Sequence, residues 1–122
     1  MTLRKGFRSE FERGFAHWLI KNNIKYEYEK SYVEYQPIIK RYTPDFYLIK
    51  QDIYIETKGF FDSADRKKHI LVREQNPEFD IRFLFVNANN KLNKSSKTTY
   101  GVWCDKNKIL WAEKRIPKEW LI

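Results

Sequence analysis

The chain has few of the features that mark secreted or membrane-spanning proteins. Cys104 is its only cysteine, which excludes an intramolecular disulfide and favours a cytoplasmic setting. No apolar run reaches the roughly 18 residues of a transmembrane helix. The N-terminal sequence MTLRKGFRSE also lacks the apolar segment of a signal peptide. We therefore expect neither a membrane-spanning helix nor secretion.

Linkers and internal repeats are absent as well. No segment rich in proline, glycine and serine divides the 122 residues, so residues 1–122 are expected to form one domain. Hydrophobic residues make up 42% of the chain and can supply a core, although a chain of this size buries only about two-thirds of its unfolded surface.

Positive charge is in excess. Lysine and arginine total 24 against 16 aspartate and glutamate residues, a net charge of +8. This balance favours a polyanionic partner, with nucleic acid first and an anionic membrane surface second. The chain contains neither a basic amphipathic helix of the interfacial kind nor a lipidation signal, which argues against the membrane.

The hydrophobic pattern predicts a mixed α/β domain with a mixed β-sheet flanked by helices. A strand that follows a helix, at residues 81–86, is expected to be a parallel crossover strand. Residues 87–99 read as a lysine-rich surface loop. The other expected elements are a helix at 9–21, a strand at 24–29, an extended segment at 32–41 interrupted at Pro37, a hairpin of 45–49 and 53–58, a helix capped by Asp62 or Ser63 that runs to about residue 75, a short helix at 100–106 and a strand at 109–112.

The hairpin carries charged residues where plain β-structure favours apolar or neutral ones. Side chains alternate along a strand, so Glu56 and Lys58 share one face and Thr57 the other. Asp45 joins the Glu56 face if a loop of two or four residues sets the register. A three-residue loop would place it opposite Thr57. The sequence permits the cluster without requiring it.

If the cluster forms, its chemistry is that of a metal-assisted phosphodiester hydrolase. A divalent cation relieves the repulsion between two nearby carboxylates, and Mg²⁺ suits such oxygen ligands. Lys58 would reach the same space and act on the attacking water or on the charge at phosphorus. The alternative is an ordinary exposed strand face beside a Pro-Asp turn.

Glu12 has two interpretations as well. It lies at the border of the apolar face of the first helix, where a carboxylate needs a partner, while Glu10 should face water. The pattern alone favours a capping box in which Glu12 bonds back to the N–H of Ser9.

Larger motifs resemble a known family. Pro44-Asp45, ten residues and then Glu56-Thr57-Lys58 resemble the PD-(D/E)XK nuclease superfamily. The segments GFRSEFE, IKYEYE, YTPDF, IETKG, DRKKHILVREQNPEFDIR, YGVWC and IPKEW resemble the bacteriophage endonuclease I family, in order and over nearly the whole chain. The resemblance implies an enzyme that resolves four-way (Holliday) junctions and, if phage-encoded, acts in the bacterial host cytoplasm.

The resemblance also assigns roles. It implies that Asp45 bridges two Mg²⁺ ions, for which Mn²⁺ can substitute. Glu56 and the main-chain oxygen of Thr57 would bind the first ion and Glu12 the second, which reverses the capping interpretation, and Lys58 would be the catalytic lysine. It further implies a PD-(D/E)XK-like core in a domain-swapped homodimer, with residues of about 1–32 exchanged and about 33–40 crossing between the halves.

Basic side chains are candidates for phosphate contacts, which position DNA without reading its sequence. They are Arg4, Lys5, Arg8, Arg66, Lys67 and Lys68, together with the loop at residues 91–97. We expect His69 to be a half-buried helix residue rather than a ligand, and Cys104 to be packed. The alternatives to junction resolution are a duplex nicking or restriction-type enzyme of the same superfamily and a non-catalytic nucleic-acid-binding module.

Overall fold

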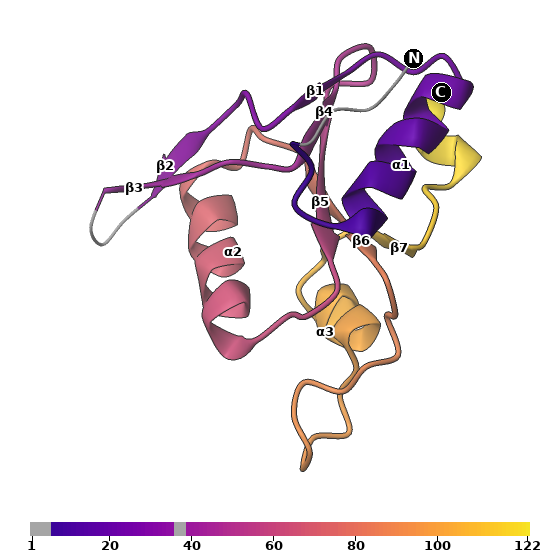
Figure 1. The fold of residues 1–122 in the computed structure, drawn as a ribbon. Coiled ribbons are helices and arrows are strands. Elements are labelled where there is room, and N and C mark those ends of the chain that lie inside the picture. Colours follow the sequence, from indigo (N-terminus) through magenta and orange to yellow (C-terminus); the bar gives the residue numbers. More distant parts are fainter. Residues whose placement is uncertain (1–5, 36–38) are drawn as a thin grey trace.

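A five-stranded mixed sheet with helices on both faces forms the centre of the molecule (Figure 1). The structure is a computed structural model that describes residues 6–35 and 39–122. Arg4, Lys5 and Pro37 lie outside the described residues. The elements are α1 (Glu10–Lys21), β1 (Tyr26–Tyr28), β2 (Val33–Tyr35), β3 (Lys40–Tyr42), β4 (Phe46–Leu48), β5 (Ile53–Lys58), α2 (Ser63–Gln75), β6 (Ile81–Phe85), α3 (Tyr100–Lys106), β7 (Trp111–Glu113) and a 3₁₀ helix (Lys118–Leu121).

The sheet has the order β1-β4-β5-β6-β7. β1, β4 and β5 pair antiparallel, whereas β5, β6 and β7 pair parallel. α2 and α3 make the two crossovers, because parallel neighbours need a long connection. The predicted parallel strand after the second helix is therefore confirmed. β2 and β3 form a separate antiparallel pair beside this sheet.

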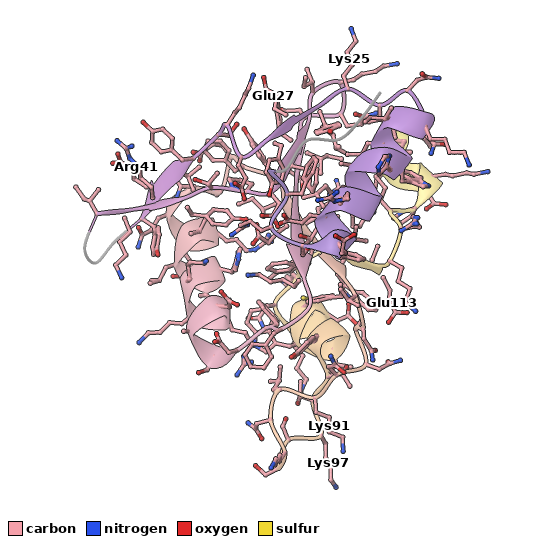
Figure 2. The ribbon with its side chains drawn as sticks, viewed as in Figure 1. Lys25, Glu27, Arg41, Lys91, Lys97 and Glu113 are labelled. Carbon is pink, nitrogen blue, oxygen red and sulfur yellow. The ribbon has the colours of Figure 1, made fainter. Side chains whose placement is uncertain are left out.

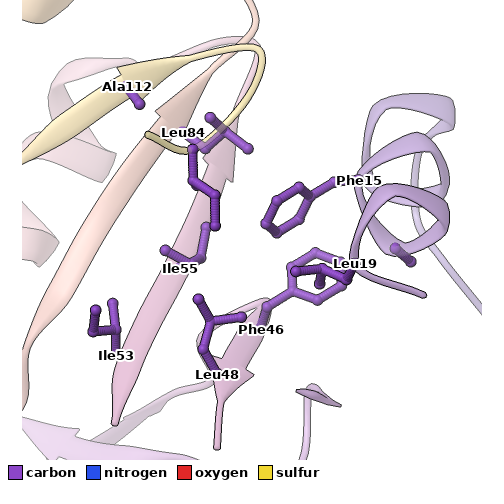
Figure 3. Packing of buried hydrophobic residues seen from close by; sticks show 10 residues of the cluster. Phe15, Leu19, Phe46, Leu48, Ile53, Ile55, Leu84 and Ala112 are labelled. Atoms are coloured by element: carbon purple, nitrogen blue, oxygen red, sulfur yellow. The ribbon is translucent and has the colours of Figure 1, made fainter. Parts of the chain in front are cut away.

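One face of the sheet is covered by α1. Phe15 and Leu19 point from the helix towards Phe46 and Ile55 on the strands, and all four are fully buried (Figure 3). Leu48, Ile53, Leu84 and Ala112 complete the labelled cluster (Figure 3). The helical spacing of the apolar residues thus fixes α1 to the sheet, and with it the residues at the start of the helix.

The opposite face is covered by α2 and α3. Phe83 and Phe85 of β6 point to this side, because side chains alternate along the strand and Leu84 points to the other. Cys104 of α3 is fully buried among them, as expected. His69 of α2 is more buried than predicted: its ring is 0% exposed and lies in edge contact with Tyr42 and Phe83.

Most predicted elements are confirmed, with differences at their ends. α1 begins one residue after its cap Ser9, α2 is capped by Asp62, and α3 has the predicted bounds. The predicted strand at 24–29 shortens to β1, and that at 109–112 shifts to β7. The predicted extended segment at 32–41 contains β2 and most of β3, which ends at Tyr42, and the two strands pair with each other within the chain.

The loop at residues 87–99 has no helix or strand of its own beyond an isolated bridge between Lys91 and Thr99. Lys91 and Lys97 lie at its tip, directed away from the helices and the sheet (Figure 2). Across residues 6–35 and 39–122, no helix combines the length and the hydrophobicity needed to span a bilayer.

Candidate active site

The hairpin register decides where Asp45 lies. β4 and β5 pair Phe46 with Ile55 and Leu48 with Ile53, so the loop between them is the four-residue loop at 49–52. One step further along this register, Asp45 lies opposite Glu56, as the hypothesis of a cluster requires. The Asp45 carboxylate turns across the strand end, where its Oδ2 accepts hydrogen bonds from the Thr57 N–H at 2.9 Å and the Thr57 hydroxyl at 2.8 Å.

α1 brings Glu12 to the same place. Ser9 caps the helix by accepting a hydrogen bond from the Glu12 N–H at 3.1 Å, so half of the predicted capping box is present. The return bond from Glu12 to the Ser9 N–H is replaced, because Glu12 Oε1 accepts hydrogen bonds from the Arg8 N–H at 2.8 Å and from the Tyr28 hydroxyl at 2.6 Å. The other oxygen, Oε2, accepts from the Thr57 hydroxyl at 3.3 Å. Glu12 is therefore both next to the cap and turned towards Asp45.

A single guanidinium lies among three carboxylates. Arg8 forms ion pairs with Asp45, with Glu29 at 2.7 Å and with Glu12 at 3.5 Å. One oxygen from each of these acids lies within 4.8 Å of the others. We refer to Arg8, Glu12, Glu29 and Asp45 as the Asp45 half of the site.

A second cation lies between two carboxylates nearby. Lys58 Nζ is 3.4 Å from Glu56 and 3.3 Å from Asp65, which belongs to the first turn of α2. The buried Tyr42 hydroxyl donates to Glu56 Oε1 at 2.7 Å. We refer to Tyr42, Glu56, Lys58 and Asp65 as the Glu56 half.

Burial and neighbouring charges shift the pKa values of ionisable side chains in both halves. Burial, together with the carboxylates of Glu56 and Glu12, raises the pKa of Asp45 to about 7 despite the contact with Arg8. Burial also raises the pKa of Glu56, and Lys58 offsets only part of this rise. Burial alone would lower the pKa of Lys58, but Glu56 and Asp65 outweigh it and the net shift is upward.

The two halves border one pocket of about 720 Å³. Glu12, Glu56, Thr57 and Lys58 line it, so four of the five predicted catalytic and metal-binding residues reach the same space. Asp45 is 1% exposed and lies beneath the lining, bonded to Thr57.

The donor set fits a hard divalent cation. Carboxylate oxygens of Glu12 and Asp45 converge, and the Arg8 guanidinium shows that a positive charge is accommodated between them. Glu56 is not part of the three-acid group found among the described residues, since its oxygens are turned to Tyr42 and Lys58. Its predicted pairing with Asp45 at one ion stays a prediction.

The basic residues expected to meet DNA have different surroundings. Arg66 donates to the main-chain oxygen of Phe61 at 2.8 Å, which holds the start of α2. Lys67 is exposed, and Lys68 lines the pocket beside Asp65 at 3.6 Å. Arg8 is engaged by the acids described above. The structure does not test phosphate contact for any of these side chains.

Several residues of the site have no local pattern that would reveal them. Glu29, Tyr42 and Asp65 contact the predicted site residues, yet each lies on a different element from its partner. The nearest available signal was the segment IKYEYE, in which Glu29 is the last acid, and the Tyr42 that opens YTPDF. The hydrophobic pattern predicts a strand over the first of these segments, but it gives neither Glu29 nor Tyr42 a role in the site.

Comparisons with known proteins agree with this resemblance. The phage endonuclease I family model matches residues 1–122. The chain is 48% identical over 120 residues to "Endodeoxyribonuclease 1" of Enterobacteria phage T3, covering 95% of this chain and 77% of the relative. It is 48% identical over 117 residues to "Endonuclease I" of Escherichia phage T7, covering 94% and 78%. These matches show that the chain belongs to the phage endonuclease I family.

Proposed function

We propose that the protein is a Mg²⁺-dependent DNA endonuclease that resolves four-way junctions and other branched DNA by phosphodiester hydrolysis. The observation that carries this function is the convergence of Glu12, Glu56 and Lys58 on one pocket, above the buried Asp45. The relative from phage T3 is named an endodeoxyribonuclease and that from phage T7 an endonuclease, which supports DNA as the substrate.

The carboxylates would hold the cofactor. Asp45 would contribute to both ions, with Glu12 at one and with Glu56 and the main-chain oxygen of Thr57 at the other, and Mn²⁺ can substitute for Mg²⁺. When bound, the ions would supply positive charge to offset the phosphodiester and the charge that develops on it during hydrolysis. Thr57 supports this arrangement, because its N–H and hydroxyl fix the direction of the Asp45 carboxylate.

Lys58 would stabilise charge at the phosphate. Its ammonium is paired with two carboxylates, which favour the protonated form, so electrostatic stabilisation fits it better than the role of a general base. Asp65 would position Lys58, and Tyr42 would orient Glu56. Lys67 and Lys68, with Arg4, Lys5 and Arg66, would position the DNA backbone.

The dimer would supply two sites that cut two strands. We propose that residues of about 1–32 exchange between two protomers and that about 33–40 cross between them. Exchange would require the β2–β3 pair to open, and it would replace the pairing of β1 with β4 and the packing of α1 on the sheet by the same contacts from a partner. Glu12 would then complete the site of the other chain.

Cleavage of a four-way junction with Mg²⁺ and with EDTA is the decisive measurement. Asp45→Asn, Glu56→Gln and Lys58→Ala should each lower cleavage by about 10²-fold or more and leave junction binding largely intact. Equal cleavage of a linear duplex of the same sequence would point to a duplex nicking enzyme. Junction binding without metal-dependent cleavage would point to a non-catalytic module.

Mixed dimers test the exchange. A dimer of one Glu12→Gln chain and one Lys58→Ala chain should regain one intact site if the two residues act across protomers. Light scattering gives the mass of the assembly. A monomer, or a mixed dimer with no recovered cleavage, would rule out the exchange.

A further inference from the structure

Arg8 is the only described side chain that contacts all three acids of the Asp45 half. Its guanidinium meets Asp45, Glu29 and Glu12, which come from the segments before β4, after β1 and at the start of α1. These acids carry three formal negative charges against one positive charge. Buried carboxylates require a counter-ion or a proton, and a single guanidinium only partly satisfies this cluster.

Arg8 differs from its partners in exposure. Its side chain is 63% exposed, whereas those of Asp45 and Glu12 are 1% and 5% exposed. The main chain is held separately, since the Arg8 N–H donates to Glu12 at 2.8 Å. The guanidinium can therefore leave the acids by rotation of its own side chain, without moving the core or the start of α1.

The guanidinium and a divalent cation would compete for the same three carboxylates. One oxygen each from Glu12, Glu29 and Asp45 lies within 4.8 Å of the others, a spacing that could hold one ion. The Arg8 pairs use carboxylate oxygens of these same three residues. An ion that takes Asp45 and Glu12 as ligands must displace the guanidinium from between them, because both occupants need the same space and the same negative charge.

We propose that Arg8 is an exchangeable counter-ion, which holds the acids of the Asp45 half together in the metal-free protein and must be displaced before a divalent cation binds there. This inference rests on the proposed metal-dependent function and adds to it a residue that limits metal binding. Arg8 lowers the apparent metal affinity, because only the fraction of molecules with the guanidinium displaced is competent to bind. Glu29, at 2.7 Å from the guanidinium, acts as its anchor.

Calorimetric titration of the DNA-free protein with Mn²⁺ tests this competition. Arg8→Ala should bind Mn²⁺ about tenfold more tightly than the unaltered chain, and Arg8→Gln should change the affinity in the same direction. Arg13→Ala is the matched control: it removes the same charge from α1, at a residue paired with the exposed Glu10 at 3.8 Å. It should change the affinity by less than about twofold.

Thermal unfolding provides a second measurement that does not depend on catalysis. In EDTA, Arg8→Ala should melt below the unaltered chain because the acids lose their counter-ion. On addition of Mn²⁺ it should gain more in Tm, since tighter binding to the folded state stabilises it more. Adding Asp45→Asn to Arg8→Ala should remove the gain in affinity, which locates the ion at this cluster.

The inference would be overturned if Arg8→Ala and Arg8→Gln bound Mn²⁺ no more tightly than Arg13→Ala. It would also be overturned if neither the unaltered chain nor any of these variants bound Mn²⁺. Failure of the proposed function is a separate result: the unaltered chain would cut DNA in EDTA, or Asp45→Asn would cut as well as the unaltered chain. If cleavage depended on metal but the Arg8 variants did not change the Mn²⁺ affinity, the counter-ion role of Arg8 would be rejected and the proposed nuclease function would stand.

Discussion

The two halves of the pocket use the same kind of contact and differ in how it is built. In the Glu56 half, Lys58 lies on the same strand as Glu56, and its other partner, Asp65, belongs to the first turn of α2. In the Asp45 half, the cation Arg8 comes from the segment before α1 and is largely exposed. The cation of the Glu56 half therefore belongs to a central strand of the sheet, whereas the Asp45 half holds a cation that can be exchanged.

Among the changes that distinguish the two halves, we expect substitution of Asp65 to have the largest effect on cleavage. Asp65→Asn removes one of the two carboxylates that hold Lys58, and we expect cleavage to fall about 10- to 100-fold, as for other residues that orient a catalytic group. The loss should appear in kcat, with KM for the junction little changed, because Lys58 itself remains.

Asp80→Asn is the matched control for Asp65→Asn. Asp80 pairs with Arg82 at 2.8 Å, at the start of β6, whereas Lys58 aligns with Phe85 at the end of that strand. Its removal should leave kcat unchanged. Equal losses in the two variants would mean that the effect of Asp65 is one of overall charge and not of positioning.

A smaller effect is expected at Tyr42. Tyr42→Phe removes the hydroxyl that donates to the buried Glu56, and we expect the free energy of unfolding to fall by about 2 kcal/mol. Tyr47→Phe is a close control, because its hydroxyl donates at 2.8 Å to Asp52 at an exposed position. Urea unfolding compares the two, and an equal cost for both would show that burial does not strengthen the Tyr42 bond.

The smallest effect is the pH dependence of the Asp45 half. The pKa of Asp45 is raised in the folded protein from 3.8 to about 7. A raised carboxyl pKa gives stability that is present below the unfolded value and is lost as the pH rises through the folded value. In EDTA, the free energy of unfolding should therefore fall by about 1 kcal/mol between about pH 6 and pH 8.

Urea unfolding in EDTA at several pH values measures this slope, and Asp45→Asn should reduce it. A stability that stays constant over the same interval would show that Arg8 keeps Asp45 ionised, because the carboxyl would then be charged in both the folded and the unfolded chain. That result would also predict that Mn²⁺ displaces a firmly held guanidinium.

Much of the fold follows from local patterns in the sequence. The spacing of Phe15 and Leu19 predicts α1, and the Asp62 cap with Asn76-Pro77 predicts the extent of α2. The last strand begins later than predicted, because the local pattern at 109–112 carries no information on tertiary contacts. Ile109 is instead buried against α3, and the strand starts at Trp111, whose ring lies against Gly101.

The site was less predictable than the fold. Alternation placed Glu56 and Lys58 on one face, but the partner of Asp45 depended on a loop length that the sequence did not determine. Glu12 fitted a capping box, and only the distant Tyr28 and Thr57 explain why its carboxylate turns to the pocket. Asp65 and Glu29 show no periodicity that marks them, because their contacts form only when separate elements meet.

The burial of Cys104 has a practical consequence for spectroscopy. Burial raises the pKa of this thiol to about 12, so a thiol-reactive dye would meet almost no thiolate there in the folded protein. A cysteine introduced at Lys97, at the exposed tip of the loop, would then take up the label selectively without replacement of the native residue (Figure 2). A fluorophore at that point, far along the chain from the acids, would allow single molecules to be followed as they meet their substrate.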